Sequence, residues 1–99
     1  MKKQGKSLKQ YVKSKKKSNE FKLAYEEVQM HLKIAHLLES LRLKAGLTQD
    51  QLAKKAGVSQ PMIARLERGD QERVPTLSTI NKVFICLGYE VDLVLKAVA

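Results

Sequence analysis

Hydrophobic residues recur at helical spacing through the first half of the chain. Two overlapping stripes predict one helix over residues 20–44 that ends at Gly46, since glycine readily adopts the left-handed conformation of a helix end. A shorter helix over residues 7–17 is predicted before it, because Ser18 or Asn19 offers a new N-cap between the two. The stripes consist of Phe21, Tyr25, Val28, Leu32 and Ala35, followed by Ile34, Leu38, Leu41 and Ala45.

The next segment carries the signals of two short helices. Thr48 and Gln51 have the spacing of a capping box and predict the start of a helix that stops at Gly57. Ser59 is placed to cap a further helix, which Gly69 ends. Two short helices joined by three residues form a helix–turn–helix.

The last part of the chain predicts a fifth helix and a strand. Pro75 and Thr76 introduce the helix, and Gly88 closes it. Apolar and polar residues then alternate over residues 89–98, which is the period of a β-strand. No other segment has this pattern, so we expect the strand to pair with the same segment of a second chain in a homodimer.

These elements predict a mainly α-helical protein in three parts. Residues 1–33 form a basic arm and a helical N-terminal extension, residues 34–88 form the helix–turn–helix domain, and residues 89–99 form the dimerising strand. The charge follows this division, since residues 1–19 carry eight lysines and no acid, whereas the net charge of the whole chain is +9. The remaining residues are therefore nearly neutral, which suits a folded domain better than a disordered polycation.

Composition excludes several classes of protein. The chain has 99 residues and one cysteine, Cys86, so we expect one domain of ordinary size without an internal disulfide, in the reducing cytoplasm. No apolar stretch approaches the roughly 20 residues that a membrane span needs. His31 and His36 are five positions apart and do not share a helix face, so no metal site is expected. No catalytic constellation or phosphate loop is present, so we expect neither an enzyme nor a cofactor.

The residue types around the turn suit DNA. The second helix of such a pair enters the major groove with its N-terminal side chains at the base edges. Gln60 can pair both of its amide groups with adenine, Arg65 can reach guanine or phosphate, and Pro61 suits a thymine methyl. Gln49, at the start of the preceding helix, can hold a phosphate. The candidate DNA contacts of the second helix are Ser59, Gln60, Pro61, Met62 and Arg65.

This segment resembles the XRE, or lambda-repressor-like, helix–turn–helix family. The matching residues are Gly46-Leu47-Thr48-Gln49, Leu52-Ala53, Gly57-Val58-Ser59-Gln60, Ile63, Leu66-Glu67 and Gly69. The resemblance implies a compact five-helix DNA-binding domain. For DNA, the resemblance assigns Gln49 to a phosphate, Ser59, Gln60 and Pro61 to bases, and Arg65 to a further contact. It places Arg73 near the minor groove. Within the fold, it implies a buried ion pair between Arg42 and Glu67.

The wider layout resembles antitoxins of the HigA type, which neutralise a RelE-like ribonuclease toxin and repress their own operon. The apolar stripe of Phe21, Tyr25 and Val28 extends beyond what the domain needs, so we expect it to bind such a toxin. Two other functions stay open at this point. One is a stand-alone XRE regulator of transcription without a toxin. The other is a protein-binding inhibitor that keeps the helix–turn–helix only as a scaffold, although Gln60 and Arg65 favour DNA.

Overall fold

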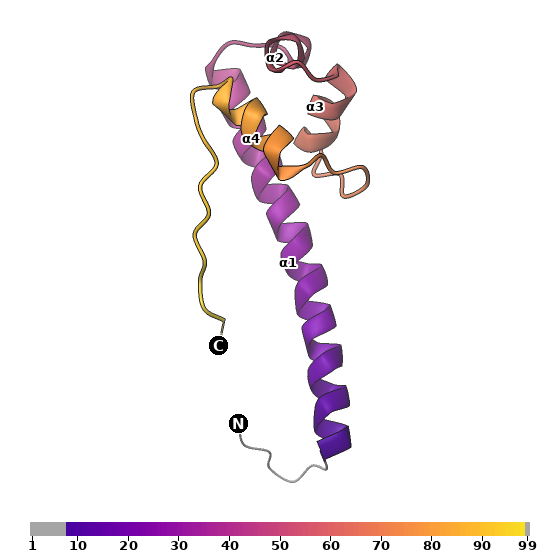
Figure 1. The fold of residues 1–99 in the computed structure, drawn as a ribbon. Coiled ribbons are helices and arrows are strands. Elements are labelled where there is room, and N and C mark those ends of the chain that lie inside the picture. The colour runs from indigo at the N-terminus through magenta and orange to yellow at the C-terminus, as the bar shows by residue number, and fades with distance from the viewer. Residues whose placement is uncertain (1–7, 99) are drawn as a thin grey trace. The chain divides into compact units, whose positions relative to one another are not determined.

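The computed structural model describes residues 8–98, with side chains from residue 18 onward, and contains four helices in this range (Figure 1). They are α1 (Leu8–Lys44), α2 (Gln49–Ala56), α3 (Gln60–Glu67) and α4 (Leu77–Ile85). The chain divides into two compact units, one ending at Met30 and the other beginning at His31. The prediction of a mainly α-helical protein is confirmed. The predictions of five helices and a C-terminal strand are wrong.

The five-helix domain implied by the resemblance is wrong, because residues 34–88 hold only the end of α1 together with α2, α3 and α4. The count of five helices along the chain fails at its N-terminal side. Helices were predicted over residues 7–17 and 20–44, but α1 runs through both segments without interruption. Ser18 and Asn19 are exposed and could cap a helix, yet each costs under about 1 kcal/mol inside one, and no proline or glycine separates the segments. Continuing the backbone hydrogen bonds therefore outweighs stopping at a cap. Ser7, at which the shorter helix was predicted to begin, lies outside the described residues.

The length of α1 does not make it a membrane helix. It has 37 residues, but polar and charged side chains recur throughout. No helix in the described part of the chain is both long and apolar enough to cross a bilayer.

The unit that begins at His31 has a core to which all four helices contribute. Figure 1 shows α2, α3 and α4 clustered beside the C-terminal part of α1. Each helix gives one of the largest fully buried side chains: Leu38, Leu52, Ile63 and Val83. Burying a side chain of this size stabilises a fold by roughly 1.5–3 kcal/mol. The second predicted stripe of α1 therefore faces this core through Leu38, with Ile34 and Leu41 packed at its edge.

Local signals fix where the short helices begin and end. The predicted capping box is confirmed, because the Thr48 hydroxyl accepts from the Gln51 N–H at 3.0 Å and the Thr48 N–H donates to Gln51 Oε1 at 2.8 Å. Gly57 adopts a left-handed φ of 71° and ends α2. Ser59 Oγ accepts from the Met62 N–H at 3.2 Å and caps α3. These contacts hold the turn between α2 and α3 in one shape.

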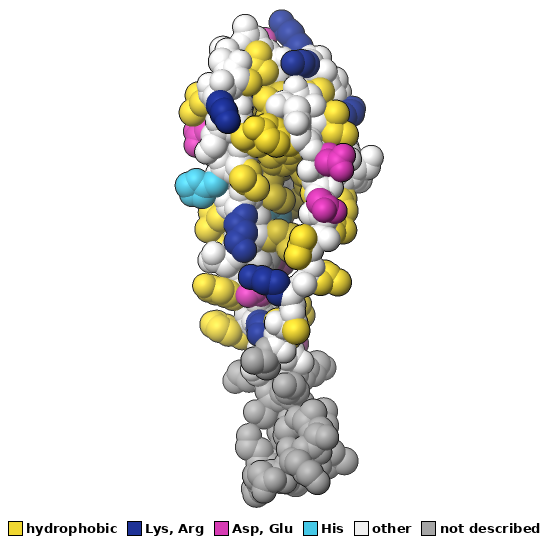
Figure 2. All heavy atoms as spheres, turned by 90° about the vertical axis from the view of Figure 1, so that its left-hand side faces the viewer, with side chains coloured by type: hydrophobic (Ala, Val, Ile, Leu, Met, Phe, Trp, Pro, Cys, Tyr) yellow, Lys and Arg dark blue, Asp and Glu magenta, His cyan; other side chains and the backbone are white. Residues whose placement is uncertain are grey.

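The segment after α4 is extended but does not form a strand. A strand needs a neighbouring strand to pair its N–H and C=O groups, and the described residues contain none. The beginning of this segment contacts the domain through Val91. The Val91 side chain packs against the core, and the Val91 N–H donates to Asn81 Oδ1 at 2.9 Å. Leu93, Val94, Leu95 and Val98 remain exposed. Figure 2 shows hydrophobic side chains exposed on the face that it presents.

The loop after α3 makes a close approach to α1 that a substitution can test. Gly46 and Gly69 have φ angles of +73° and +71°, so an alanine costs roughly 1–2 kcal/mol at either position. A Cβ at Gly69 would also meet Leu32 Cδ2 at 3.2 Å, whereas nothing lies within 4 Å at Gly46. We therefore expect Gly69→Ala to lower the free energy of unfolding more than Gly46→Ala, measured by urea denaturation. Equal losses would mean that the loop can move away from α1.

Candidate nucleic-acid interface

The exposed face of α3 begins at its N-terminal turn. Ser59 and Pro61 are exposed, and Pro61 fits the first turn because the N–H it lacks would have had no helical partner there. Gln60 is half-buried, and Met62 packs against the edge of the core. The structure therefore gives Ser59, Gln60 and Pro61 free surface at this turn, while much of Met62 faces the domain.

An ion pair ties α1 to the end of α3. Arg42 Nε donates to Glu67 Oε2 at 2.6 Å and Arg42 Nη2 donates to Glu67 Oε1 at 2.9 Å. The third nitrogen, Nη1, donates to the Leu47 carbonyl oxygen at 2.8 Å. The two charged side chains are only 10% and 4% exposed. One guanidinium thus fastens α1, the turn before α2, and α3 to one another.

The electrostatics of the pair keep the arginine charged. Its hydrogen bond to Glu67 raises the pKa of Arg42, and this effect outweighs burial, which acts in the opposite direction. A raised pKa in the folded state means that the stability contributed by the guanidinium is fully present below the pKa of unfolded arginine. The cationic side of the pair is therefore intact at every pH at which proteins are ordinarily handled.

Two glutamines join the ion pair to the start of α3. Gln49, the first residue of α2, donates from Nε2 to Glu67 Oε1 at 3.0 Å. Gln60, the first residue of α3, donates from Nε2 to Gln49 Oε1 at 2.8 Å. The residues expected at a phosphate and at a base thus lie in contact. One N–H on each amide nitrogen remains available to a ligand.

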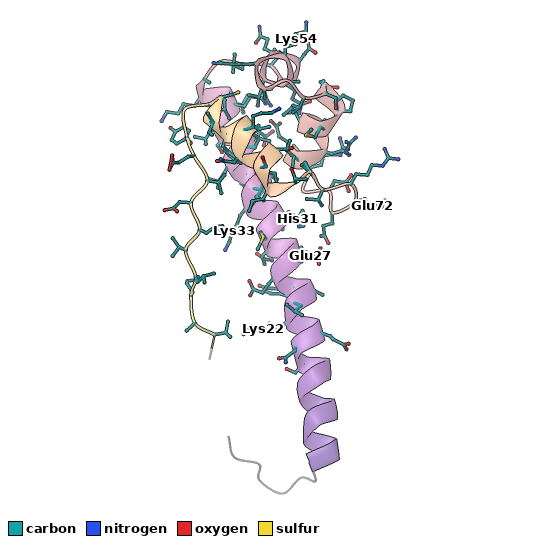
Figure 3. All side chains as sticks on the ribbon, viewed as in Figure 1. Lys22, Glu27, His31, Lys33, Lys54 and Glu72 are labelled. Atoms are coloured by element: carbon teal, nitrogen blue, oxygen red, sulfur yellow. The ribbon has the colours of Figure 1, made fainter. Side chains whose placement is uncertain are left out.

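The two arginines expected at DNA lie in different settings. Arg65 is half-buried on α3, and its Nε is the one buried side-chain polar atom in the described residues without a hydrogen-bond partner. Arg73 is exposed in the loop between α3 and α4, where it has a left-handed φ of 54°. The structure does not bring Arg73 into the hydrogen-bonded group around Gln60. Figure 3 labels Glu72, which precedes Arg73 in the sequence, in this loop and Lys54 on α2.

Comparison with known proteins agrees with this geometry. The family model of the HTH_3 helix–turn–helix proteins matches residues 38–94. The chain belongs to this family. A helix–turn–helix is a DNA-binding motif, so the HTH_3 domain makes DNA the expected ligand of the exposed start of α3. No curated protein matches the chain.

A solved structure with the same domain is the crystal structure of an HTH_3 family transcriptional regulator from Vibrio cholerae. It is 35% identical in sequence and superposes with a TM-score of 0.57 over 63% of the present chain. The match covers 34% of that regulator, so the chain spans about a third of its length. The likeness therefore concerns the HTH_3 domain.

Sequence reasoning treated Glu67 as half of a structural pair and missed its bond to Gln49. A usable signal was present for the contact between Gln49 and Gln60, because they are the first residues of two helices joined by a tight turn. The bond to Glu67 carried no such signal, since 18 residues separate it from Gln49. The Leu47 carbonyl bond to Arg42 was missed as well, because nothing in a sequence marks which backbone oxygen a buried guanidinium will find.

Removing one side of the buried pair should destabilise the HTH_3 domain strongly. Glu67→Ala leaves the Arg42 guanidinium in a site from which water is largely excluded, and such losses cost about 3–5 kcal/mol. The control is Lys54→Ala, which breaks an exposed pair with Asp50 at 3.3 Å and should cost no more than about 1 kcal/mol. Denaturant unfolding of both variants gives the two values. Similar small losses would show that water reaches the Arg42 site.

Proposed function

We propose that the chain is a sequence-specific DNA-binding regulator of transcription and not an enzyme. The observation that carries this proposal is the position of Gln60 at the exposed start of α3, held by Gln49 on a rigid helix–turn–helix. The likeness to the Vibrio cholerae protein, which is a transcriptional regulator, supports it.

The exposed turn of α3 offers the chemistry that base reading needs. Gln60 keeps an acceptor oxygen and one N–H, which together match the major-groove edge of adenine. Pro61 offers apolar surface suited to a thymine methyl, and Ser59 offers a hydroxyl. Gln49 retains an N–H for a phosphate, and the half-buried Arg65 adds a cation on α3.

Replacing Gln60 should alter sequence preference at one base pair. Binding sites are first selected from random duplexes with the wild-type protein. Gln60→Ala should then cost about 1–3 kcal/mol on the selected site and relax the preference at a single position. The control is Gln29→Ala, a glutamine on α1 outside the helix–turn–helix. Equal losses on selected and random DNA would mean that Gln60 does not read a base.

We infer that the protein acts as a homodimer. The exposed apolar side chains of residues 93–95 support this, because a small domain rarely leaves such a group of side chains in water. Dimers of helix–turn–helix proteins bind paired half-sites about 34 Å apart. The selected duplexes should therefore contain inverted repeats with this spacing. Selection of isolated half-sites would contradict the dimer.

We further propose that the protein is the antitoxin of a RelE-like toxin and that it autoregulates its operon. The support comes from the unit that ends at Met30. Phe21, Tyr25 and Val28 are 76%, 55% and 37% exposed and follow one face of α1 by their helical spacing. A helix binds a groove of a partner through anchors spaced in this way.

The chain provides a matched control for toxin binding. Leu23 and Met30 are also exposed, at 69% and 61%, but helical geometry places them on the opposite face of α1. We expect Phe21→Ala with Tyr25→Ala to abolish co-purification with a RelE-like toxin encoded beside this gene, while DNA binding by the free protein is retained. Leu23→Ala with Met30→Ala should leave recovery unchanged. Equal recovery from both double variants would remove the Phe21 face from the interface.

A further inference from the structure

A continuous series of hydrogen bonds connects the candidate base-reading side chain to the buried ion pair. We call its four side chains, Arg42, Glu67, Gln49 and Gln60, the Glu67 network. Glu67 Oε1 accepts from both Arg42 Nη2, at 2.9 Å, and Gln49 Nε2, at 3.0 Å. Gln49 Oε1 in turn accepts from Gln60 Nε2 at 2.8 Å.

The charge of Glu67 sets the direction of every bond in the Glu67 network. An ionised carboxylate can only accept, so the group of Gln49 that faces it must be the NH2. The oxygen of Gln49 then faces Gln60, and Gln60 must present its own NH2 to that oxygen. A glutamine amide can otherwise be turned end for end at little cost, because its oxygen and nitrogen occupy similar positions.

The direction of these bonds decides what Gln60 offers to a ligand. Its NH2 is tied inward by one hydrogen, so the oxygen and the second N–H remain at the edge of the amide. An oxygen of this kind accepts from the exocyclic amino group of adenine while the N–H donates to adenine N7. With the amide reversed, the NH2 would be outermost and would favour bases that present acceptors, guanine and thymine.

We propose that Glu67 is a positioning residue for base recognition, which fixes the amide orientation of Gln60 through Gln49 and thereby selects adenine. This inference rests on the proposed DNA-binding function. Glu67 itself does not touch DNA in this scheme, since its side chain is 4% exposed and its oxygens are engaged by Arg42 and Gln49. The same carboxylate therefore both stabilises the fold and directs specificity.

Glu67→Gln tests the proposal because it keeps the shape of the side chain and replaces one acceptor with a donor. The relevant base pair is the one at which Gln60→Ala removes the preference. For the wild type we expect adenine there. For Glu67→Gln we expect the affinity ratio of adenine to guanine or thymine at that position to fall about tenfold. The ratios at all other positions should stay unchanged, whereas a merely structural defect would weaken every sequence alike.

A second variant covers the case in which Glu67→Gln does not fold. Gln49→Met cannot form either hydrogen bond but leaves Arg42 and Glu67 paired. This variant should bind all sequences more weakly, because it lacks the phosphate contact proposed for Gln49. It should in addition lose the adenine preference at the Gln60 position. Lys54→Ala, on the same helix as Gln49, is the control and should keep the wild-type preferences.

The outcomes separate this inference from the function on which it rests. If the wild-type protein selects no sequence, the proposed function fails and the inference falls with it. If the wild type selects a site but prefers another base at the Gln60 position, the inference alone is wrong. The inference is also wrong if Glu67→Gln folds and keeps the adenine preference. If Glu67→Gln does not fold, the inference is wrong when Gln49→Met keeps that preference.

Discussion

The bidentate pair between Arg42 and Glu67 is the contact on which the arrangement of the DNA-binding unit depends. Arg42 also binds the Leu47 carbonyl, so one side chain meets α1, the turn after it, and α3. Removing the two charges of a buried pair from water costs free energy. This cost is offset only when the remaining donors and acceptors of both side chains form hydrogen bonds. Here Glu67 accepts a further hydrogen bond from Gln49. Gln49 in turn accepts from Gln60 at the exposed start of α3, so the ion pair also restricts the position of Gln60.

Residues close in sequence determine where α2 and α3 begin and end, and the shared hydrophobic core holds the two helices together. Thr48 and Ser59 satisfy backbone N–H groups that helix starts leave unpaired, and Gly57 turns the chain between them. Leu52 and Ile63, one from each helix, are fully buried in the same core. A rigid turn matters for recognition, because a side chain that reads a base must be held within a fraction of an ångström of its productive position.

On either side of the helix–turn–helix in the sequence, apolar side chains are exposed among the residues that the structure describes. Phe21 and Tyr25 lie on one side in sequence, and Leu93, Val94 and Leu95 on the other, all of them exposed. Such groups in a small protein are typical of partner surfaces. The proposed toxin and the proposed second copy of the chain would each remove one of them from water. Regulation by such a protein would then depend on which partners are bound.

The sequence by itself determined the features that depend on near neighbours. The capping box of Thr48, the N-cap of Ser59 and the left-handed Gly57 each involve residues within a few positions, so their chemistry is readable from spacing alone. The same holds for the helical stripe through Leu38. The motif also resembles a family pattern, and this resemblance predicts the ion pair between Arg42 and Glu67.

Only the tertiary structure decided the rest. Whether Ser18 and Asn19 stop a helix depends on small free-energy differences, and here α1 continues. Whether residues 89–98 become a strand depends on a partner strand, and alternation of side chains cannot supply one. The bond from Glu67 to Gln49 joins residues 18 positions apart. Its existence follows from how α2 and α3 pack, because only packing brings a buried carboxylate against the start of another helix.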